Sequence, residues 1–417
     1  MTICTSSFNG LGRAQAKALG HPELPIAVIP HPFGFRSRAE VHDIATRCVD
    51  DINQLLCEAV SSSAPAAVSA VERATLVEAP ADFDEFYDFA LARRWSDGLP
   101  LVPPTAERFE RMLRHTRRAP DDVVASIAPA YGAATVERIA INAVMAGCAP
   151  ELLPVLIAAV EAIVVPKFNL QSVQATTNPA AVWIIVNGPI AEKLGINGGG
   201  NCLGSGSRAN ATLGRAMRLI QQNIGGAYPR ETDHATHGQP GKYTFCCAEN
   251  EAVSPWEPLS VERGYAPDAS TVTVVAALGT WSMNTHAKDK DDLLRIIADT
   301  MTFPAGSDFV HTGGEPWLIL APEHAQVLKR DGLSKIDVKR RLWEQARLAG
   351  SRLSAKDFAR TQDARRAELG QIGPDTLLSI SLRPEDIGVI VAGGVGAHST
   401  YVPNCGNSRS VTCEIKP

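Results

Sequence analysis

The pattern of apolar and polar positions predicts a mixed α/β protein. Residues 182–186, Val-Trp-Ile-Ile-Val, form a short β-branched and aromatic run without charge, which is typical of a buried strand. Similar runs at residues 271–278 and 315–320 predict two more strands. A helix after the first run is predicted from apolar residues at helical spacing, Leu213, Met217, Ile220 and Ile224.

The N-terminal residues predict a small βαβ fragment. Strands at residues 2–4 and 25–30 flank a helix at 8–19, and a second helix ends near residue 56. Two parallel strands are too few for a stable sheet, so we expect them to complete a sheet elsewhere, in this chain or another. The small-residue run SSSAPAAVSA, residues 61–70, is typical of a linker.

The elements after this linker repeat. The order strand, helix, glycine-rich turn, strand, helix, helix occurs around residues 123–224 and again around 272–348. Residues 182–189 also align loosely with residues 317–322. We therefore predict two similar three-layer α/β halves that face a cleft, with the glycine-rich turns at that cleft. The predicted boundaries are 1–60 for the fragment, 61–82 for the linker, 83–258 for the first half and 259–417 for the second.

Composition excludes several classes of protein. The 417 residues are 45% apolar and carry a net charge of −5 without a basic block, so nucleic acid binding is not expected. No apolar run has membrane-spanning length, and no signal peptide is evident. The nine cysteines are scattered and include no zinc-binding spacing, which indicates reduced thiols in the cytoplasm. No cofactor is predicted, and nothing supports a metal.

The glycine-rich turn at residues 197–208 is the first candidate site. Glycines allow close approach of the backbone, and free N–H groups at the following helix favour an anion or a carbonyl oxygen. The turn has neither the Walker lysine nor the GxGxxG order, so a nucleotide is not implied. The alternative is a well-capped structural turn. The candidate binding residues are Asn197, Gly199, Gly200, Ser205, Gly206, Ser207 and Arg208, with Gly393 and Gly394 from a second glycine-rich turn.

Five residues are candidates for catalysis. A thiol near helix N–H groups has a lowered pKa, so Cys202 is a candidate nucleophile or redox centre, with a small buried filler as the alternative. Glu249 is a candidate general base if it is buried, and Lys242 lies on the same connecting segment; the alternative is a solvated acidic loop. His398 and Ser399 follow a predicted strand as acid/base and hydroxyl donor, although neighbouring residues rarely face each other.

A family resemblance adds to this picture. Residues 8–32, FNGLGRAQAKALGHPELPIAVIPHP, resemble the small domain of the UGSC family, whose members carry a selenocysteine- or cysteine-Gly-Ser-Cys motif. The segments DGLPLVPPT at 97–105 and GGVGAHS at 393–399 resemble the long region that accompanies such domains. This chain has no sequence that matches the motif. The resemblance implies a hetero-oligomer with a small cysteine- or selenocysteine-containing subunit.

These observations predict a cytoplasmic enzyme subunit with a small carboxylate or carbonyl substrate. The expected chemistry is thiol-dependent, either redox or cleavage of a carbon–heteroatom bond, with Cys202 or a thiol of the partner as nucleophile. One alternative is a hydrolase or lyase that uses Glu249, Lys242 and His398 without a thiol. Another is a non-catalytic assembly subunit.

Overall fold

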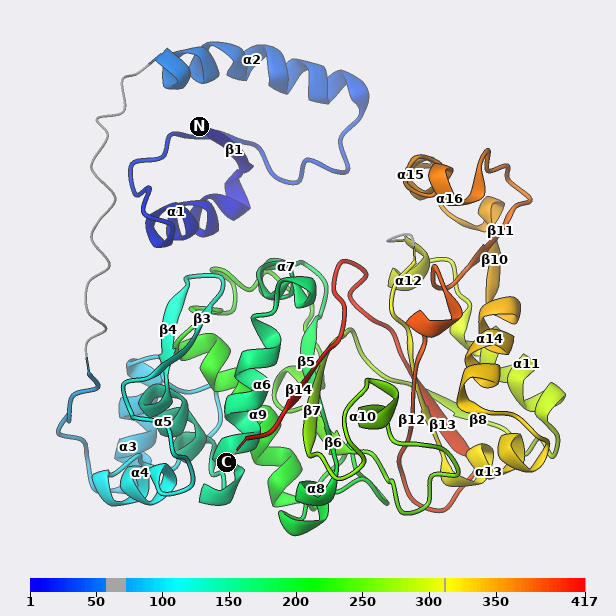
Figure 1. Cartoon of the computed structure of the whole chain (residues 1–417). Helices are drawn as coiled ribbons and strands as arrows, with labels where there is room; N and C mark the ends of the chain where they lie inside the picture. Colours follow the sequence, from blue (N-terminus) through cyan, green and yellow to red (C-terminus); the bar gives the residue numbers. More distant parts are fainter. Residues whose placement is uncertain (58–72, 311–312, 417) are drawn as a thin grey trace.

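The computed structural model describes residues 1–57, 73–310 and 313–416 (Figure 1). In the N-terminal fragment, β1 (Thr2–Thr5) pairs in parallel with β2 (Ile26–Ile29). The helix α1 (Asn9–Ala18) lies between them in sequence, and α2 (Arg38–Cys57) follows. These elements lie where the sequence predicts them. Within the described residues the two strands pair only with each other, and the predicted linker at 61–70 lies outside those residues.

Two four-stranded sheets form the centre of the molecule. The first has the order β14-β7-β5-β6 and the second the order β12-β9-β13-β8. The first sheet consists of β5 (Ala181–Asn187), β6 (Cys246–Ala248), β7 (Thr271–Ala277) and β14 (Val411–Glu414). The second consists of β8 (Trp281–Asn284), β9 (Trp317–Leu320), β12 (Gly388–Val391) and β13 (His398–Val402).

The two sheets have the same pattern of strand pairing, and the chain crosses from one sheet to the other and back. In each sheet a parallel pair, β5 with β6 or β9 with β12, is extended by two antiparallel strands. After β7 the chain crosses to the second sheet as β8, and after β13 it returns to the first sheet as β14. The sheets are therefore not separated by a cut of the chain at residue 258, because β7 and β14 both belong to the first sheet.

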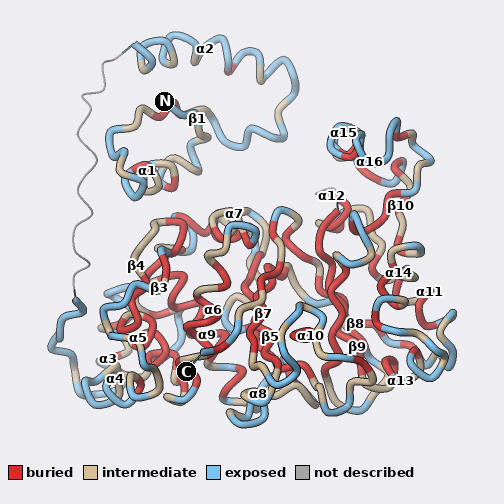
Figure 2. Tube along the Cα trace, viewed as in Figure 1, coloured by how far each residue is buried: buried red, intermediate tan, exposed pale blue. Residues whose placement is uncertain are grey.

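The inner faces of the sheets pack directly against each other. Trp183 and Ile185 from β5 share one buried cluster with Trp317 and Ile319 from β9. The two indole rings meet edge to face, with 5.7 Å between centroids and 79° between planes. Figure 2 shows the buried residues concentrated in these strands and in the helices beside them. Because strand residues alternate between faces, the intervening residues of β5 point to the helices instead.

Helices cover only the outer face of each sheet. The first sheet is covered by α5 (Val136–Ala146), α6 (Leu153–Ile163) and α9 (Arg208–Asn223). The second is covered by α11 (Lys290–Met301), α13 (Pro322–Arg330) and α14 (Lys335–Gln345). The α/β class is confirmed. The layering differs from two three-layer halves around a cleft: the apolar inner faces pack into a helix–sheet–sheet–helix arrangement (Figure 1).

Shorter elements complete the fold. Threonine hydroxyls cap two helices by accepting a bond from the third helical N–H: Thr105 caps α4 (Ala106–Leu113), and Thr135 caps α5. The remaining α-helices are α3 (Phe83–Ala92), α7 (Leu170–Ala175), α8 (Pro189–Lys193), α10 (Leu259–Glu262), α12 (Ser307–Val310), α15 (Ala355–Ala364) and α16 (Arg366–Leu369). The remaining strands are β3 (Val123–Ile127), β4 (Gly132–Thr135), β10 (Arg347–Ala349) and β11 (Leu377–Ser379). The described residues also form six short 3-10 helices, η1 (Ser6–Phe8), η2 (Pro150–Leu152), η3 (Pro166–Phe168), η4 (Pro240–Lys242), η5 (Gly350–Arg352) and η6 (Pro384–Asp386).

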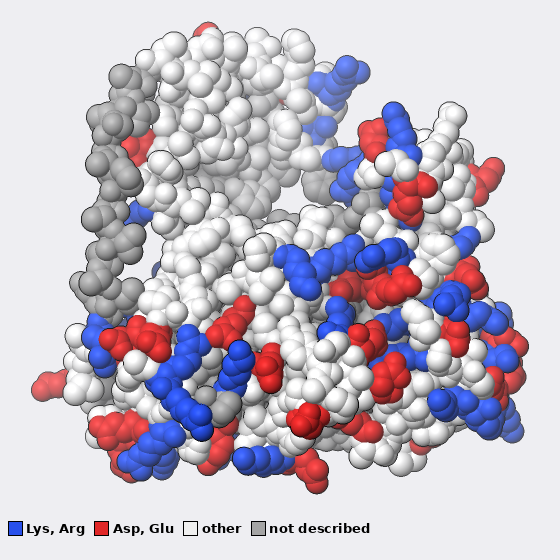
Figure 3. Space-filling model, in the orientation of Figure 1, with Lys and Arg blue, Asp and Glu red and all other residues white. Residues whose placement is uncertain are grey.

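The surface mixes charges of both signs. On the face in Figure 3, lysine and arginine side chains alternate with aspartate and glutamate side chains over both halves. On this face the mixture forms no continuous basic stripe. Within residues 1–57, 73–310 and 313–416, no helix combines the length and apolar character needed to cross a membrane.

Candidate functional site

The two glycine-rich turns meet where the parallel strands of both sheets end. The Asn250 amide, just after β6, donates to the Val391 carbonyl at the end of β12 at 2.8 Å. The Gly393 amide donates to the Gly198 carbonyl, also at 2.8 Å. A Cβ added to Gly394 would lie 2.8 Å from the Gly200 Cα, so the turns touch without room for a side chain. Carboxyl ends of parallel strands are common positions for ligand sites.

Cys202 is buried at this junction and has a lowered pKa. The Cys247 thiol, from β6, donates a hydrogen bond to the Cys202 sulfur. The backbone amides of Cys202, Leu203 and Gly393 also lie close to this sulfur, although those of Cys202 and Gly393 donate to the Gly199 and Gly198 carbonyls as well. Together with the Cys247 bond they outweigh burial and lower the pKa of Cys202. The same bond, together with burial, holds the pKa of Cys247 well above its ordinary value. Of the two sulfurs, Cys202 is therefore the one that loses its proton more easily.

Asn210 positions the turn that carries Cys202. Its Oδ1 accepts from the Asn197 amide at 2.8 Å, and its Nδ2 donates to the Asn197 and Cys202 carbonyls at 2.8 and 2.9 Å. Asn210 is 3% exposed and lies in the first turn of α9. Sequence reasoning missed this residue. The only signal in the sequence was an asparagine in the first turn of the predicted helix, whose role the apolar pattern does not explain.

A cavity of about 550 Å³ lies beside the turn. Its walls include Asn197, Gly200, Ser205, Gly206, Ser207 and Arg208. The polar groups are partly used within the protein. The Arg208 Nε and Nη2 atoms donate to the Gly147 carbonyl, and the Ser207 hydroxyl caps α9. The Asn197 side chain bonds to the amide of Gly199 and the carbonyl of Gly200. The turn is thus a capped structure that also forms a cavity wall.

Glu249 is buried at the same end of the first sheet. Its Oε2 accepts from Asn187 Nδ2 at 2.6 Å and from the Leu259 amide at 2.8 Å. Within the described residues, its Oε1 has no partner. Burial raises the pKa of Glu249, while the charge of Lys335 opposes this. Glu251 also accepts from Asn187 Nδ2, at 2.8 Å. The two carboxyl groups therefore hold the last residue of β5 in place, and Glu249 does not lie in a solvated loop.

Lys242 lies at the opposite end of the first sheet. It lines a small cavity with Ala181 and Val182, which begin β5, whereas Glu249 bonds to Asn187, which ends it. A strand of seven residues spans about 20 Å. The Lys242 Nζ is paired with the Asp233 carboxylate at 2.7 Å. Burial lowers the pKa of Lys242, and Asp233 opposes this effect. The structure does not bring Lys242 and Glu249 together.

His398 and Ser399 point in different directions, because successive strand residues alternate. His398 is exposed, whereas Ser399 is buried and lies 2.7 Å from His324 Nδ1. His324 Nε2 lies 3.0 Å from the Thr285 carbonyl, so this nitrogen carries the proton and Nδ1 accepts from the serine. Ser399 Oγ also accepts from the Ala321 amide. This buried pair therefore holds the start of α13.

The structure provides no metal centre within its described residues, where no three His, Cys, Asp or Glu side chains are grouped closely enough. His234 packs its ring against Phe8 of the N-terminal fragment, with 4.5 Å between centroids. A second link between fragment and body joins Lys356 Nζ to the Gly34 carbonyl at 3.1 Å.

Comparison with known proteins identifies the N-terminal fragment. Residues 1–58 match the model of the UGSC family, which confirms the resemblance predicted for this segment. No curated protein and no solved structure matches the chain.

The matched segment contains a candidate that sequence reasoning missed. Cys4-Thr5-Ser6-Ser7 joins β1 to the helical turn before α1, and it keeps the first cysteine and the third-position serine of the UGSC motif. The signal was a Cys-x-x-Ser sequence between a predicted strand and a predicted helix. Partial burial raises the pKa of Cys4, and the charge of Arg13 opposes this, so Cys4 lacks the thiolate stabilisation of Cys202.

Proposed function

We propose that the chain is an enzyme subunit in which the Cys202 thiolate attacks a small substrate that carries a carboxylate or carbonyl group. The observation that supports this most directly is the set of donors around Cys202: one thiol and three backbone amides that lower its pKa. A thiolate is the nucleophilic form of cysteine, and a lowered pKa is typical of a reactive one.

The surroundings support the substrate class. The cavity of about 550 Å³ has the size of small-molecule sites, and its walls combine apolar residues such as Leu152 and Leu194 with the polar groups of the turn and Arg208. In the proposed reaction the sulfur forms a bond to the electrophilic atom, the bond to the leaving group breaks, and the leaving group takes its proton from solvent.

Cys202 is expected to react with iodoacetamide at lower pH than Cys413. Burial raises the pKa of Cys413, which is half-buried, so at pH 7 we expect Cys202 to be alkylated at least about 10-fold faster. Peptide mass spectrometry of the full-length protein over pH 5–10 measures both rates. Cys247→Ala removes the donor and should move the Cys202 profile to higher pH.

The matched control is Cys246→Ala, because Cys246 is equally buried but points to the helical side of the sheet. This variant should leave the Cys202 profile unchanged. A Cys202 that stays unmodified at every pH while Cys413 reacts would contradict the proposal, as would equal profiles for the two alanine variants.

The N-terminal fragment is the proposed docking element for a second chain. Within the described residues, β1 and β2 have no further strand on either side, and apolar side chains are exposed around them, with Phe35 95% exposed. Unpaired strand edges favour addition of a strand from another chain. We assign this place to the small cysteine- or selenocysteine-containing subunit that the family resemblance implies.

Untagged protein purified from its source should therefore have a mass in solution well above the 44.5 kDa of one chain. Size-exclusion chromatography with light scattering measures this mass, and mass spectrometry identifies the partner. A single 44.5 kDa chain with full activity would overturn the assembly proposal. In the same material, loss of turnover in Cys4→Ser but not in Cys202→Ser would place the active thiol at Cys4 instead.

A further inference from the structure

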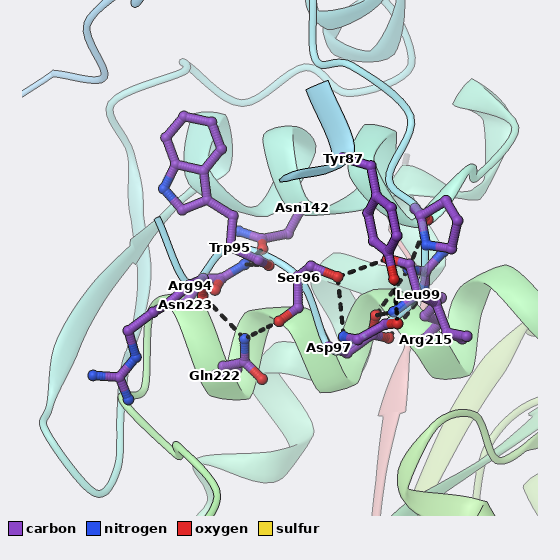
Figure 4. A network of polar contacts seen from close by, with 12 residues as sticks. Tyr87, Arg94, Trp95, Ser96, Asp97, Leu99, Asn142, Arg215, Gln222 and Asn223 are labelled. Atoms are coloured by element: carbon purple, nitrogen blue, oxygen red, sulfur yellow. Dashed lines mark hydrogen bonds and ion pairs between the residues drawn. The ribbon is translucent and has the colours of Figure 1, made fainter. Parts of the chain in front are cut away.

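The segment at residues 94–102, which includes the Asp-Gly-Leu-Pro sequence, is attached to α9 by side chains (Figure 4). Gln222 and Asn223 donate to the backbone carbonyls of residues 94–96 at 2.9–3.1 Å. Arg215 forms a two-bond pair with the Asp97 carboxylate at 2.8 and 2.9 Å. It also donates to the carbonyls of residues 99 and 100. The segment has no helix or strand of its own, yet its backbone is held in place.

This attachment positions Trp95 at a large cavity. In Figure 4 the Trp95 ring points away from the network of bonds that holds its backbone. The cavity has a volume of about 1030 Å³, at the upper end of the range for small-molecule sites. It shares no lining residue with the cavity beside the glycine-rich turn at residues 197–208. Its apolar wall is formed by Phe86, Trp95, Phe109, Ile141 and Met145.

The polar part of the cavity carries a net positive charge. Arg73, Arg93 and Arg108 line it together with two glutamates, Glu110 and Glu137. Glu137 is buried and already neutralised, since it accepts from Arg73 Nε and from the Ala74 amide, both at 2.9 Å. Within the described part of the chain, Arg93 and Arg108 form no ion pair with a carboxylate.

Two further contacts point to a ligand. The Arg93 guanidinium lies over the Phe89 ring at 4.1 Å and 5.8 Å from the Trp95 ring, which keeps a cation beside the aromatic wall. Asn223 lines the cavity, and its Oδ1 is buried without a hydrogen-bond partner in the described residues. A buried acceptor of this kind costs free energy unless a ligand or water donates to it.

We propose that this cavity binds an organic anion with an aromatic or bulky apolar body and a carboxylate. Trp95 and its apolar neighbours contact the body, the arginines pair with the carboxylate, and Asn223 accepts from a water molecule or, where the ligand carries one, from a donor of the ligand. This second site goes beyond the proposed chemistry at Cys202, because it needs no thiol and lies against α3, α4 and α5.

The probe for the test is 2-naphthoate, titrated into the full-length protein by isothermal calorimetry. We expect saturable binding with one equivalent per chain, weakened at least about 10-fold in Trp95→Ala by loss of the aromatic wall. The control Trp281→Ala changes an exposed tryptophan on β8 and should bind as the unmodified protein does. Arg93→Gln should weaken naphthoate more than its neutral analogue 2-naphthalenemethanol.

Three outcomes would overturn the proposal: no saturable binding up to millimolar naphthoate, equal affinity in Trp95→Ala, or equal affinity for the anion and the neutral alcohol. If Trp95→Ala fails to fold, Trp95→Phe takes its place in the test, because phenylalanine keeps an aromatic ring in the wall. This variant should retain most of the affinity for naphthoate. Cys202→Ser separates this site from the proposed reaction, since naphthoate binding should not change in that variant even if thiol reactivity is lost.

Discussion

Replacing Trp183 by alanine is expected to lower the free energy of unfolding by about 3–5 kcal/mol, the typical loss for a large aromatic residue in a core. Trp183 is fully buried between the sheets. Its ring stacks on Phe245 at 5.4 Å and meets Trp317 edge to face at 5.7 Å. The two sheets share this cluster, so the cavity left by the change weakens both halves. Denaturation by urea, followed by circular dichroism, measures the loss.

Trp281→Ala is the matched control, because Trp281 is 60% exposed and its truncation should cost less than about 0.5 kcal/mol. A double-mutant cycle of Trp183→Phe and Trp317→Phe should show a coupling of about 0.5–1.5 kcal/mol, the range for paired aromatic rings. Equal losses in Trp183→Ala and Trp281→Ala would show that the sheets do not pack through this pair.

Asp308→Asn is expected to remove a decline in stability between about pH 4 and pH 7. Burial raises the pKa of Asp308 to about 7, against an ordinary value of 3.8, although the Tyr401 hydroxyl donates to it at 2.5 Å. The folded state thus keeps a proton that the unfolded state releases above pH 4. Folding stability therefore falls as pH rises through this window, by about 4 kcal/mol in all. Asparagine is neutral at every pH and avoids this loss.

Urea denaturation at pH 4.5, 6.0 and 7.5 tests this expectation. The variant should lose the slope and should be more stable than the unmodified protein at pH 7.5. Asp363→Asn changes an aspartate with an 81% exposed side chain and should leave the slope as it was. An unchanged slope in Asp308→Asn would mean that Asp308 does not hold the proton.

The sequence alone was sufficient for elements whose signals are local. The strands and helices of the N-terminal fragment, the core strand β5 and the helix α9 lie where the apolar spacing predicts them. Residues 182–189 and 317–322, which align loosely, contain the facing strands β5 and β9, where Trp183 meets Trp317. Such features depend on periodicity over a few residues, which a single sequence contains.

Only the tertiary structure decided where the chain crosses between the two sheets and how the sheets and helices are stacked. The strands β6, β8, β13 and β14 have three to five residues each, too few for a clear period, and their positions depend on hydrogen bonds to distant strands. Because the chain crosses between the sheets after β7 and again after β13, a division of the chain by sequence similarity could not separate the two sheets. The inner faces then pack on each other instead of lining an open cleft.

The candidate site was likewise predictable from the sequence only in part. The glycine-rich turns and Cys202 were visible as local patterns, and the fold brings the two turns into contact. The lowered pKa of Cys202 depends on Cys247 and Gly393, which lie 45 and 191 residues away along the chain. Ser399 contacts His324 and not its neighbour His398. Lys242 lies at the end of β5 opposite to Glu249. Residue types predicted which groups can react, whereas long-range packing decided which of them meet.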